Sequence, residues 1–226
     1  MSPASIAAHK VNYLFRAVTG TTVELLGNPS LITGIGSCIN QARNSNWEAG
    51  EPWWNSRAIE YLQNRLPREG RAFEWGSGGS TAWLARNGMR VTAIESESEW
   101  AERVRERCPE ADVRFIPGAD TGTFRSEPQL RDRGVHYFDE YISAINNFEA
   151  ETFDVIVIDG ICRKECASLA AEKVKRSGII VLDDTNWKFL RPAADAFEGW
   201  ETATFSGFKP KSGLFVYSTT FFHPPT

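Results

Sequence analysis

The chain has 226 residues, 42% of them hydrophobic, and a formal net charge of −4. A chain of this length can bury a sizeable core within one large domain. Its acidic balance and scattered lysines and arginines argue against a nucleic-acid partner, because such binding depends largely on neutralising phosphates. Met1–Lys10 lacks the pattern of a signal peptide and no apolar run approaches the roughly 20 residues of a membrane span, so we expect a cytoplasmic protein without a membrane partner.

The first 66 residues differ in pattern from the remainder. Helices are predicted at Ile6–Val18 and Ser56–Leu66, separated by breaks rich in Gly and Asn. Asn55 or Ser56 is a suitable N-cap for the second of these helices. We interpret residues 1–66 as a helical cap packed on a core domain formed by residues 67–226.

From residue 71 onward, short apolar runs alternate with amphipathic stretches. Strands are predicted at Arg71–Trp75, Arg90–Ile94, Val113–Ile116, Phe153–Ile158 and Ile179–Leu182, and helices at Ser80–Asn87, Ser96–Cys108, Phe138–Asn147 and Arg163–Arg176. The tail adds two strands, Glu201–Phe205 and Leu214–Phe222, whose short connection requires an antiparallel pair. The order predicts an α/β fold with a doubly wound, mainly parallel sheet and a C-terminal antiparallel strand pair.

A glycine-rich loop, E-W-G-S-G-G-S-T, runs from Glu74 to Thr81 between the first strand and the first helix. Open α/β sheets bind ligands at this end of their strands. A dinucleotide fingerprint requires a third small residue where Thr81 stands, so that motif is incomplete. The loop instead resembles the first motif of class I S-adenosylmethionine-dependent methyltransferases, Asp/Glu-x-Gly-x-Gly, and in particular bacterial methyltransferases with the same eight residues.

The resemblance spans roughly residues 71–185 and implies a Rossmann-like methyltransferase fold that binds S-adenosylmethionine. It places Glu95, at the tip of the second strand, on the ribose hydroxyls, and Asp120, in the turn after the third strand, beside the adenine amine. The cofactor-binding residues that it implies are Glu74, Gly76, Ser77, Gly78, Ser80, Thr81, Glu95, Asp120 and Asp159.

Methyl transfer to a hydroxyl or an amine requires a group that removes a proton, and the candidates are Asp159, Asp184 and His136. Acids at neighbouring strand ends suggest a second possibility. In the catechol and caffeoyl-coenzyme A types of O-methyltransferase, acids at these strand ends, with an Asn, hold a divalent ion. Asp159, Asp183 and Asp184 could hold Mg²⁺ in this way, although the final pair here is Asp-Asp rather than Asp-Asn.

Trp53, Trp54 and Trp187 are the predicted walls of a pocket for a small, partly aromatic acceptor. Adjacent side chains in an extended segment cannot both face one core, which favours a pocket role for the tryptophan pair. The sequence therefore predicts a small-molecule methyltransferase. Two alternatives remain open: a nucleotide-dependent oxidoreductase, and a protein that binds S-adenosylmethionine without catalysing methyl transfer.

Overall fold

The structure is a computed structural model that describes residues 46–125, 136–209 and 216–225. Its strands are β1 (Gly70–Trp75), β2 (Met89–Glu95), β3 (Asp112–Phe115), β4 (Phe153–Ile158), β5 (Val174–Leu182), β6 (Glu201–Phe208) and β7 (Val216–His223). The α-helices are α3 (Asn46–Ala49), α4 (Ser56–Gln63), α5 (Gly79–Arg86), α6 (Ser98–Arg107), α7 (Asp139–Ser143) and α8 (Arg163–Lys173), and the 3₁₀ helices are η2 (Ala144–Asn147) and η3 (Arg191–Phe197).

The seven strands form one sheet in the order β3-β2-β1-β4-β5-β7-β6. The first five in this order are parallel, whereas β7 is antiparallel to both β5 and β6. This arrangement confirms the predicted doubly wound sheet and its C-terminal antiparallel pair. The chain order reverses between β1 and β4, and a sheet of this kind binds its ligands outside the carboxyl ends of the strands at that point.

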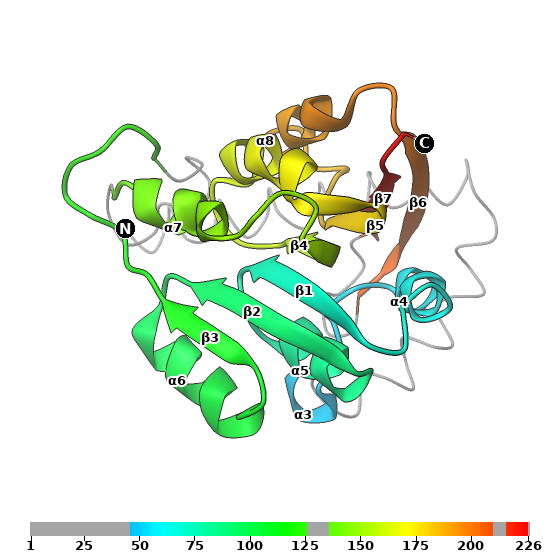
Figure 1. Ribbon diagram of the computed structural model, residues 1–226, viewed down its shortest axis with the longest axis horizontal. Coiled ribbons are helices and arrows are strands. Elements are labelled where there is room, and N and C mark those ends of the chain that lie inside the picture. Colours follow the sequence, from blue (N-terminus) through cyan, green and yellow to red (C-terminus); the bar gives the residue numbers. More distant parts are fainter. Residues whose placement is uncertain (1–45, 126–135, 210–215, 226) are drawn as a thin grey trace, which may run out of the picture.

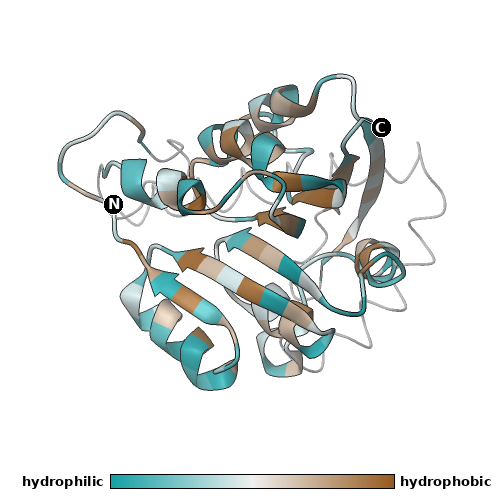
Figure 2. Cartoon of the chain, viewed as in Figure 1, coloured by the Kyte–Doolittle hydropathy of each residue, from teal (hydrophilic) through white to brown (hydrophobic). Residues whose placement is uncertain are grey.

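Helices cover both faces of the sheet, with α7 and α8 on one side and α3, α5 and α6 on the other (Figure 1). Each face has its own cluster of buried side chains, and strand residues alternate between the two. Strand β4 illustrates this, since Ile156 faces one cluster and Val157 the other. Strands β4 and β5 are hydrophobic along most of their length, whereas α6 is mostly hydrophilic (Figure 2). No helix in the described part of the chain is long and apolar enough to span a membrane.

The boundary between α8 and β5 differs from the prediction. The helix ends at Lys173 and the strand begins at Val174, so Val174–Arg176 belongs to β5 rather than to the helix. Val174 pairs with Phe153, and the register then shifts before Val155 meets Ile179. Pairing with β4 therefore outweighs the helical pattern over these residues, as tertiary contacts often do.

The N-terminal segment is described only from residue 46 onward, so the predicted helix Ile6–Val18 lies outside the described residues. Asn55 caps α4 as predicted, since its side chain accepts a hydrogen bond from the Ala58 amide at 3.1 Å. Its amide nitrogen also donates to the carbonyl of Phe205 in β6 at 2.9 Å. Helix α4 thus packs against β6, whereas α3 packs against α5. The proposed boundary between cap and core at residue 66 stays a prediction.

Candidate functional site

The glycine loop follows β1 and approaches the turn after β4. Gly76 has a φ of +92°, and a Cβ there would lie 3.1 Å from the backbone nitrogen of Gly160. Gly160 is equally confined, because its own Cβ would collide with the Tyr141 hydroxyl. Glycine suits position 76 because it tolerates the positive φ and the nearby backbone, and it suits position 160 because a side chain would collide with Tyr141. The two glycines therefore allow the ends of β1 and β4 to meet.

Glu74 lies beneath the loop and is almost completely buried. It accepts hydrogen bonds from the hydroxyls of Ser80 and Thr81, the latter at 2.6 Å. Thr81 also accepts a hydrogen bond from the Gly78 amide at 2.9 Å, so it connects the acid to the loop backbone. Burial raises the pKa of Glu74 to about 7. The residue that breaks the dinucleotide fingerprint thus has a structural role in the loop.

Glu95 ends β2 with its carboxylate beside the loop. One oxygen accepts from the Ser77 amide at 3.1 Å and hydroxyl at 2.8 Å, and the other from the amides of Ser96 at 2.7 Å and Glu97 at 3.0 Å. Burial raises its pKa despite these donors. The acid is held firmly in place, and a carboxylate can accept further bonds through its remaining lone pairs.

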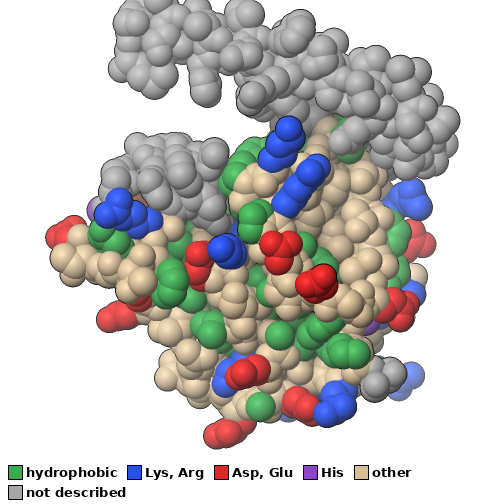
Figure 3. Space-filling model, turned by 90° about the horizontal axis from the view of Figure 1, so that it is seen from above, with side chains coloured by type: hydrophobic (Ala, Val, Ile, Leu, Met, Phe, Trp, Pro, Cys, Tyr) green, Lys and Arg blue, Asp and Glu red, His purple; other side chains and the backbone are tan. Residues whose placement is uncertain are grey.

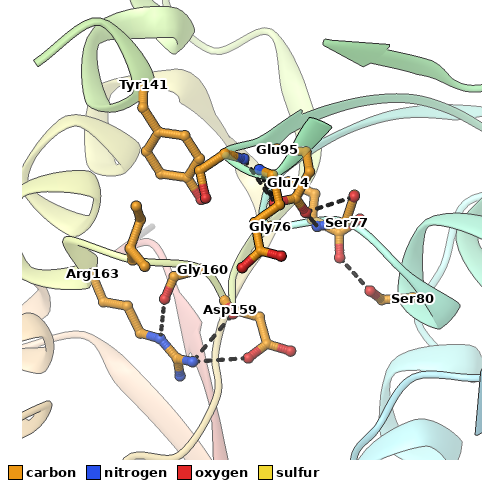
Figure 4. Close-up of a pocket in the computed structure, with 12 residues that line it drawn as sticks. Glu74, Gly76, Ser77, Ser80, Glu95, Tyr141, Asp159, Gly160 and Arg163 are labelled. Atoms are coloured by element: carbon orange, nitrogen blue, oxygen red, sulfur yellow. Dashed lines mark hydrogen bonds and ion pairs between the residues drawn. The ribbon is translucent and has the colours of Figure 1, made fainter. Parts of the chain in front are cut away.

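A cavity of about 290 Å³ opens at this edge of the sheet, close to the lower limit of roughly 300 Å³ for ligand pockets. It is lined by Glu74, Gly76, Ser77, Ser80, Glu95, Ser96, Glu97, Tyr141, Asp159, Gly160, Ile161 and Arg163 (Figure 4). Six of the predicted cofactor residues are therefore brought together here. Gly78 and Thr81 support the loop without lining the cavity, and Asp120 is exposed and lies outside it.

Arg163, the first residue of α8, is a pocket residue that the sequence interpretation missed. Its guanidinium donates to the carbonyl of Gly160 at 2.8 Å and pairs with the Asp159 carboxylate at 3.1 Å (Figure 4). It also donates to the carbonyl of Asp183 at 2.7 Å. A cation in the first turn of a helix opposes the helix dipole. That unfavourable position was the available signal that Arg163 has an acidic partner.

Asp159, Asp183 and Asp184 converge as predicted, and each offers a carboxylate oxygen within 4.8 Å of the others. The interpretation missed Lys209, which follows β6. Its ammonium donates to Asp183 and, at 2.6 Å, to Asp184. Burial raises the pKa of Asp183 to about 8 despite this neighbour, and burial also raises that of Asp159.

The predicted pocket tryptophans separate. Trp53 is 49% exposed and Trp187 is 38% exposed. The ring centroid of Tyr217 lies 6.2 Å from that of Trp53 and 6.1 Å from that of Trp187. Trp54 is fully buried in the core cluster that also contains Ala58, so it is a core residue and not a pocket wall. The reasoning that the pair cannot face one core is correct, but only Trp53 faces outward.

His136, a predicted proton acceptor, lies outside the cavity lining. A Cβ added at Gly118 would lie only 2.6 Å from the Cβ of His136. The next residue, Tyr137, pairs with Ala119 through two backbone hydrogen bonds of 2.8 and 2.9 Å. The structure thus places His136 beside the turn after β3.

The sheet order and the antiparallel β7 are typical of the Rossmann-like methyltransferase fold. A precorrin-6y C5,15-methyltransferase from Geobacter metallireducens is similar at a TM-score of 0.52 and 16% identity, over 75% of this chain and 87% of that one. A methyltransferase-like protein from Silicibacter pomeroyi is similar at a TM-score of 0.50 and 21% identity, over 77% and 89%. No protein-family model matches the chain, and no curated protein matches it.

Proposed function

We propose that the chain is a methyltransferase that binds S-adenosylmethionine and methylates an oxygen or a nitrogen of a small-molecule acceptor. The observation that carries this proposal is the Glu95 carboxylate, which lies in the cavity wall beside the glycine loop. A carboxylate at the tip of the second strand suits the two hydroxyls of a ribose. When bound, the cofactor would supply a methyl group on a sulfonium sulfur, and the neutral thioether is a good leaving group.

The charge of the cavity supports this ligand. The acidic residues in its lining are Glu74, Glu95, Glu97 and Asp159. The basic residue among the lining residues that the structure describes is Arg163. S-adenosylmethionine carries a sulfonium, an ammonium and a single carboxylate, so an acidic cavity favours its net positive charge. A pyrophosphate would meet like charges there, and this disfavours the alternative of a nucleotide-dependent oxidoreductase.

Asp159 is the best placed of the three predicted proton acceptors. It lines the cavity with its side chain 26% exposed, and Arg163 fixes its position. Burial raises its pKa, and a general base works best when its pKa approaches the working pH. Asp184 is instead engaged by Lys209 and Arg163, the latter at 3.6 Å.

The acceptor side would be the half-exposed surface of Trp53 and Trp187, which favours a planar or aromatic small molecule.

A nucleic-acid acceptor is disfavoured by the charge pattern. Where side chains are described on the face shown in Figure 3, acidic and basic residues are interspersed and apolar side chains lie between them. Phosphate recognition would require a continuous basic stripe.

Calorimetric titration tests the proposal with S-adenosylmethionine, its demethylated product and NAD as ligands. Wild type should bind the first two and not NAD. Glu95→Gln should weaken binding about 10- to 100-fold, because a hydrogen bond to a charged group contributes about 1.5–3 kcal/mol. Glu99→Gln is the matched control, since this exposed acid in α6 lies outside the cavity lining. Binding of NAD alone, or of none of the three ligands, would overturn the proposal.

Catalysis needs a separate measurement. Wild type is incubated with S-adenosylmethionine and a panel of phenolic, amine and sugar-like compounds, and release of the demethylated product is followed. Asp159→Asn should lower the rate at saturating cofactor by about 10²–10⁴-fold, because removing a general base typically has an effect of this size. Cofactor binding without turnover on any compound would favour the alternative of a non-catalytic binding protein.

A further inference from the structure

The three aspartates at the ends of β4 and β5 have the composition of a divalent-metal site, which makes their actual partners informative. Carboxylate oxygens of Asp159, Asp183 and Asp184 lie within 4.8 Å of one another, and Asp183 is 1% exposed. Three carboxylates this close repel one another strongly in a buried setting. Such a cluster is stabilised by a nearby cation.

The chain itself supplies that cation. Lys209 is 2% exposed, and its Nζ donates to one oxygen of Asp183 and, at 2.6 Å, to Asp184 Oδ1. The second oxygen of Asp183 accepts from the Thr219 hydroxyl at 2.7 Å. In addition, the Arg163 guanidinium lies 3.1 Å from Asp159 and 3.6 Å from Asp184. Each aspartate is thus paired with a protein cation.

These contacts do not fit a divalent ion. Mg²⁺ requires carboxylate oxygens at about 2.0–2.1 Å in near-octahedral geometry. Here the Lys209 ammonium lies between Asp183 and Asp184, where the ion would need to be, and protein donors engage both oxygens of Asp183. An ion could enter only by displacing a buried positive charge from its partners.

The aromatic surroundings of Lys209 also suit a cation. Its Nζ lies 4.7 Å from the ring centroid of Tyr217 and 5.2 Å from that of Trp53, and aromatic faces attract cations at such distances. The ammonium therefore contacts two carboxylates and also lies near two aromatic rings.

We propose that Lys209 is a resident cation that takes the place of a divalent metal at this acidic edge of the sheet. The cluster of three aspartates is then closed to metal in the wild-type protein and opens only when the ammonium is removed. One consequence rests on the proposed function: methyl transfer by this chain proceeds without a divalent ion.

Mn²⁺ alone is the probe for the test, with binding followed by electron paramagnetic resonance and by calorimetry. Wild type and Lys209→Arg should bind no Mn²⁺ at this cluster. Lys209→Met, which keeps the apolar stem but removes the charge, should gain a site at least about tenfold tighter than any wild-type binding, because an unscreened group of carboxylates attracts the ion. The double variant Lys209→Met/Asp183→Asn should lose that gained site.

Two results would overturn the proposal. One is stoichiometric Mn²⁺ binding to wild type that Asp183→Asn abolishes, and the other is a folded Lys209→Met variant that gains no site. If Lys209→Met does not fold, the wild-type titration still decides between a closed and an open cluster. Neither measurement uses S-adenosylmethionine or an acceptor, so its outcome is separate from that of the proposed function.

Discussion

Replacing Glu74 by Gln should flatten the dependence of stability on pH. Burial raises the pKa of Glu74 from 4.5 to about 7, although the Ser80 and Thr81 hydroxyls favour the ionised form. The folded protein therefore holds this proton more tightly than the unfolded chain does. The associated stability is present at pH values below 4.5 and is lost as the pH rises through about 7. A shift from 4.5 to about 7 corresponds to about 3 kcal/mol at 1.36 kcal/mol per unit.

Urea denaturation of both proteins at several pH values between about 5 and 8 measures this effect. Wild type should lose about 2–3 kcal/mol more of its unfolding free energy than Glu74→Gln over that range. Subtracting one profile from the other removes the contributions of other buried acids, among them Asp183. Parallel profiles would refute the reasoning.

Ser80→Ala is the matched variant for the same experiment. The Ser80 hydroxyl donates to the Glu74 carboxylate and lowers its pKa, in opposition to burial. Its removal should therefore move the loss of stability to higher pH, whereas Glu74→Gln should remove it. A shift to lower pH would contradict the assignment of this hydrogen bond.

Two further pairs of variants test the packing around the site. Trp54→Ala should lower the unfolding free energy by about 3–5 kcal/mol because the Trp54 side chain is fully buried. Trp53 is half-exposed, so Trp53→Ala should lower the unfolding free energy by less than about 2 kcal/mol. Equal losses for the two variants in chemical denaturation would contradict this difference. Gly79→Ala should destabilise by at least about 2 kcal/mol, because the new Cβ would collide with the backbone of Glu51, with its carbonyl carbon at 2.8 Å. A Cβ at Gly199 would meet no described atom within 4 Å, so Gly199→Ala has only the φ of +81° to overcome and should lower the unfolding free energy by about 1 kcal/mol. If thermal unfolding shows Gly199→Ala to be the more destabilising of the two variants, the close approach at Gly79 is refuted.

Much of the fold could be predicted from the sequence because its signals are local. The apolar run Phe153–Ile158 and the glycine loop after Trp75 follow from neighbouring residues alone. An acid that ends a buried parallel strand, such as Glu95, or directly follows one, such as Asp159, must lie at the carboxyl edge of the sheet. The cofactor side of the candidate site is built from such positions, so six of its predicted residues meet in the cavity.

The charge balance of the site could be known only from the tertiary structure. Lys209 follows Asp183 by 26 residues, and only the pairing of β7 with both β5 and β6 brings its ammonium onto the aspartates. Likewise, the contacts of β7 and α4 decide that Trp53 faces outward while Trp54 enters the core. The sequence by itself determined which acids and glycines stand at the end of each strand, because these positions follow from local sequence patterns. Which cation neutralises the acids, and which aromatic ring faces the acceptor side, depend on long-range packing that no local pattern encodes.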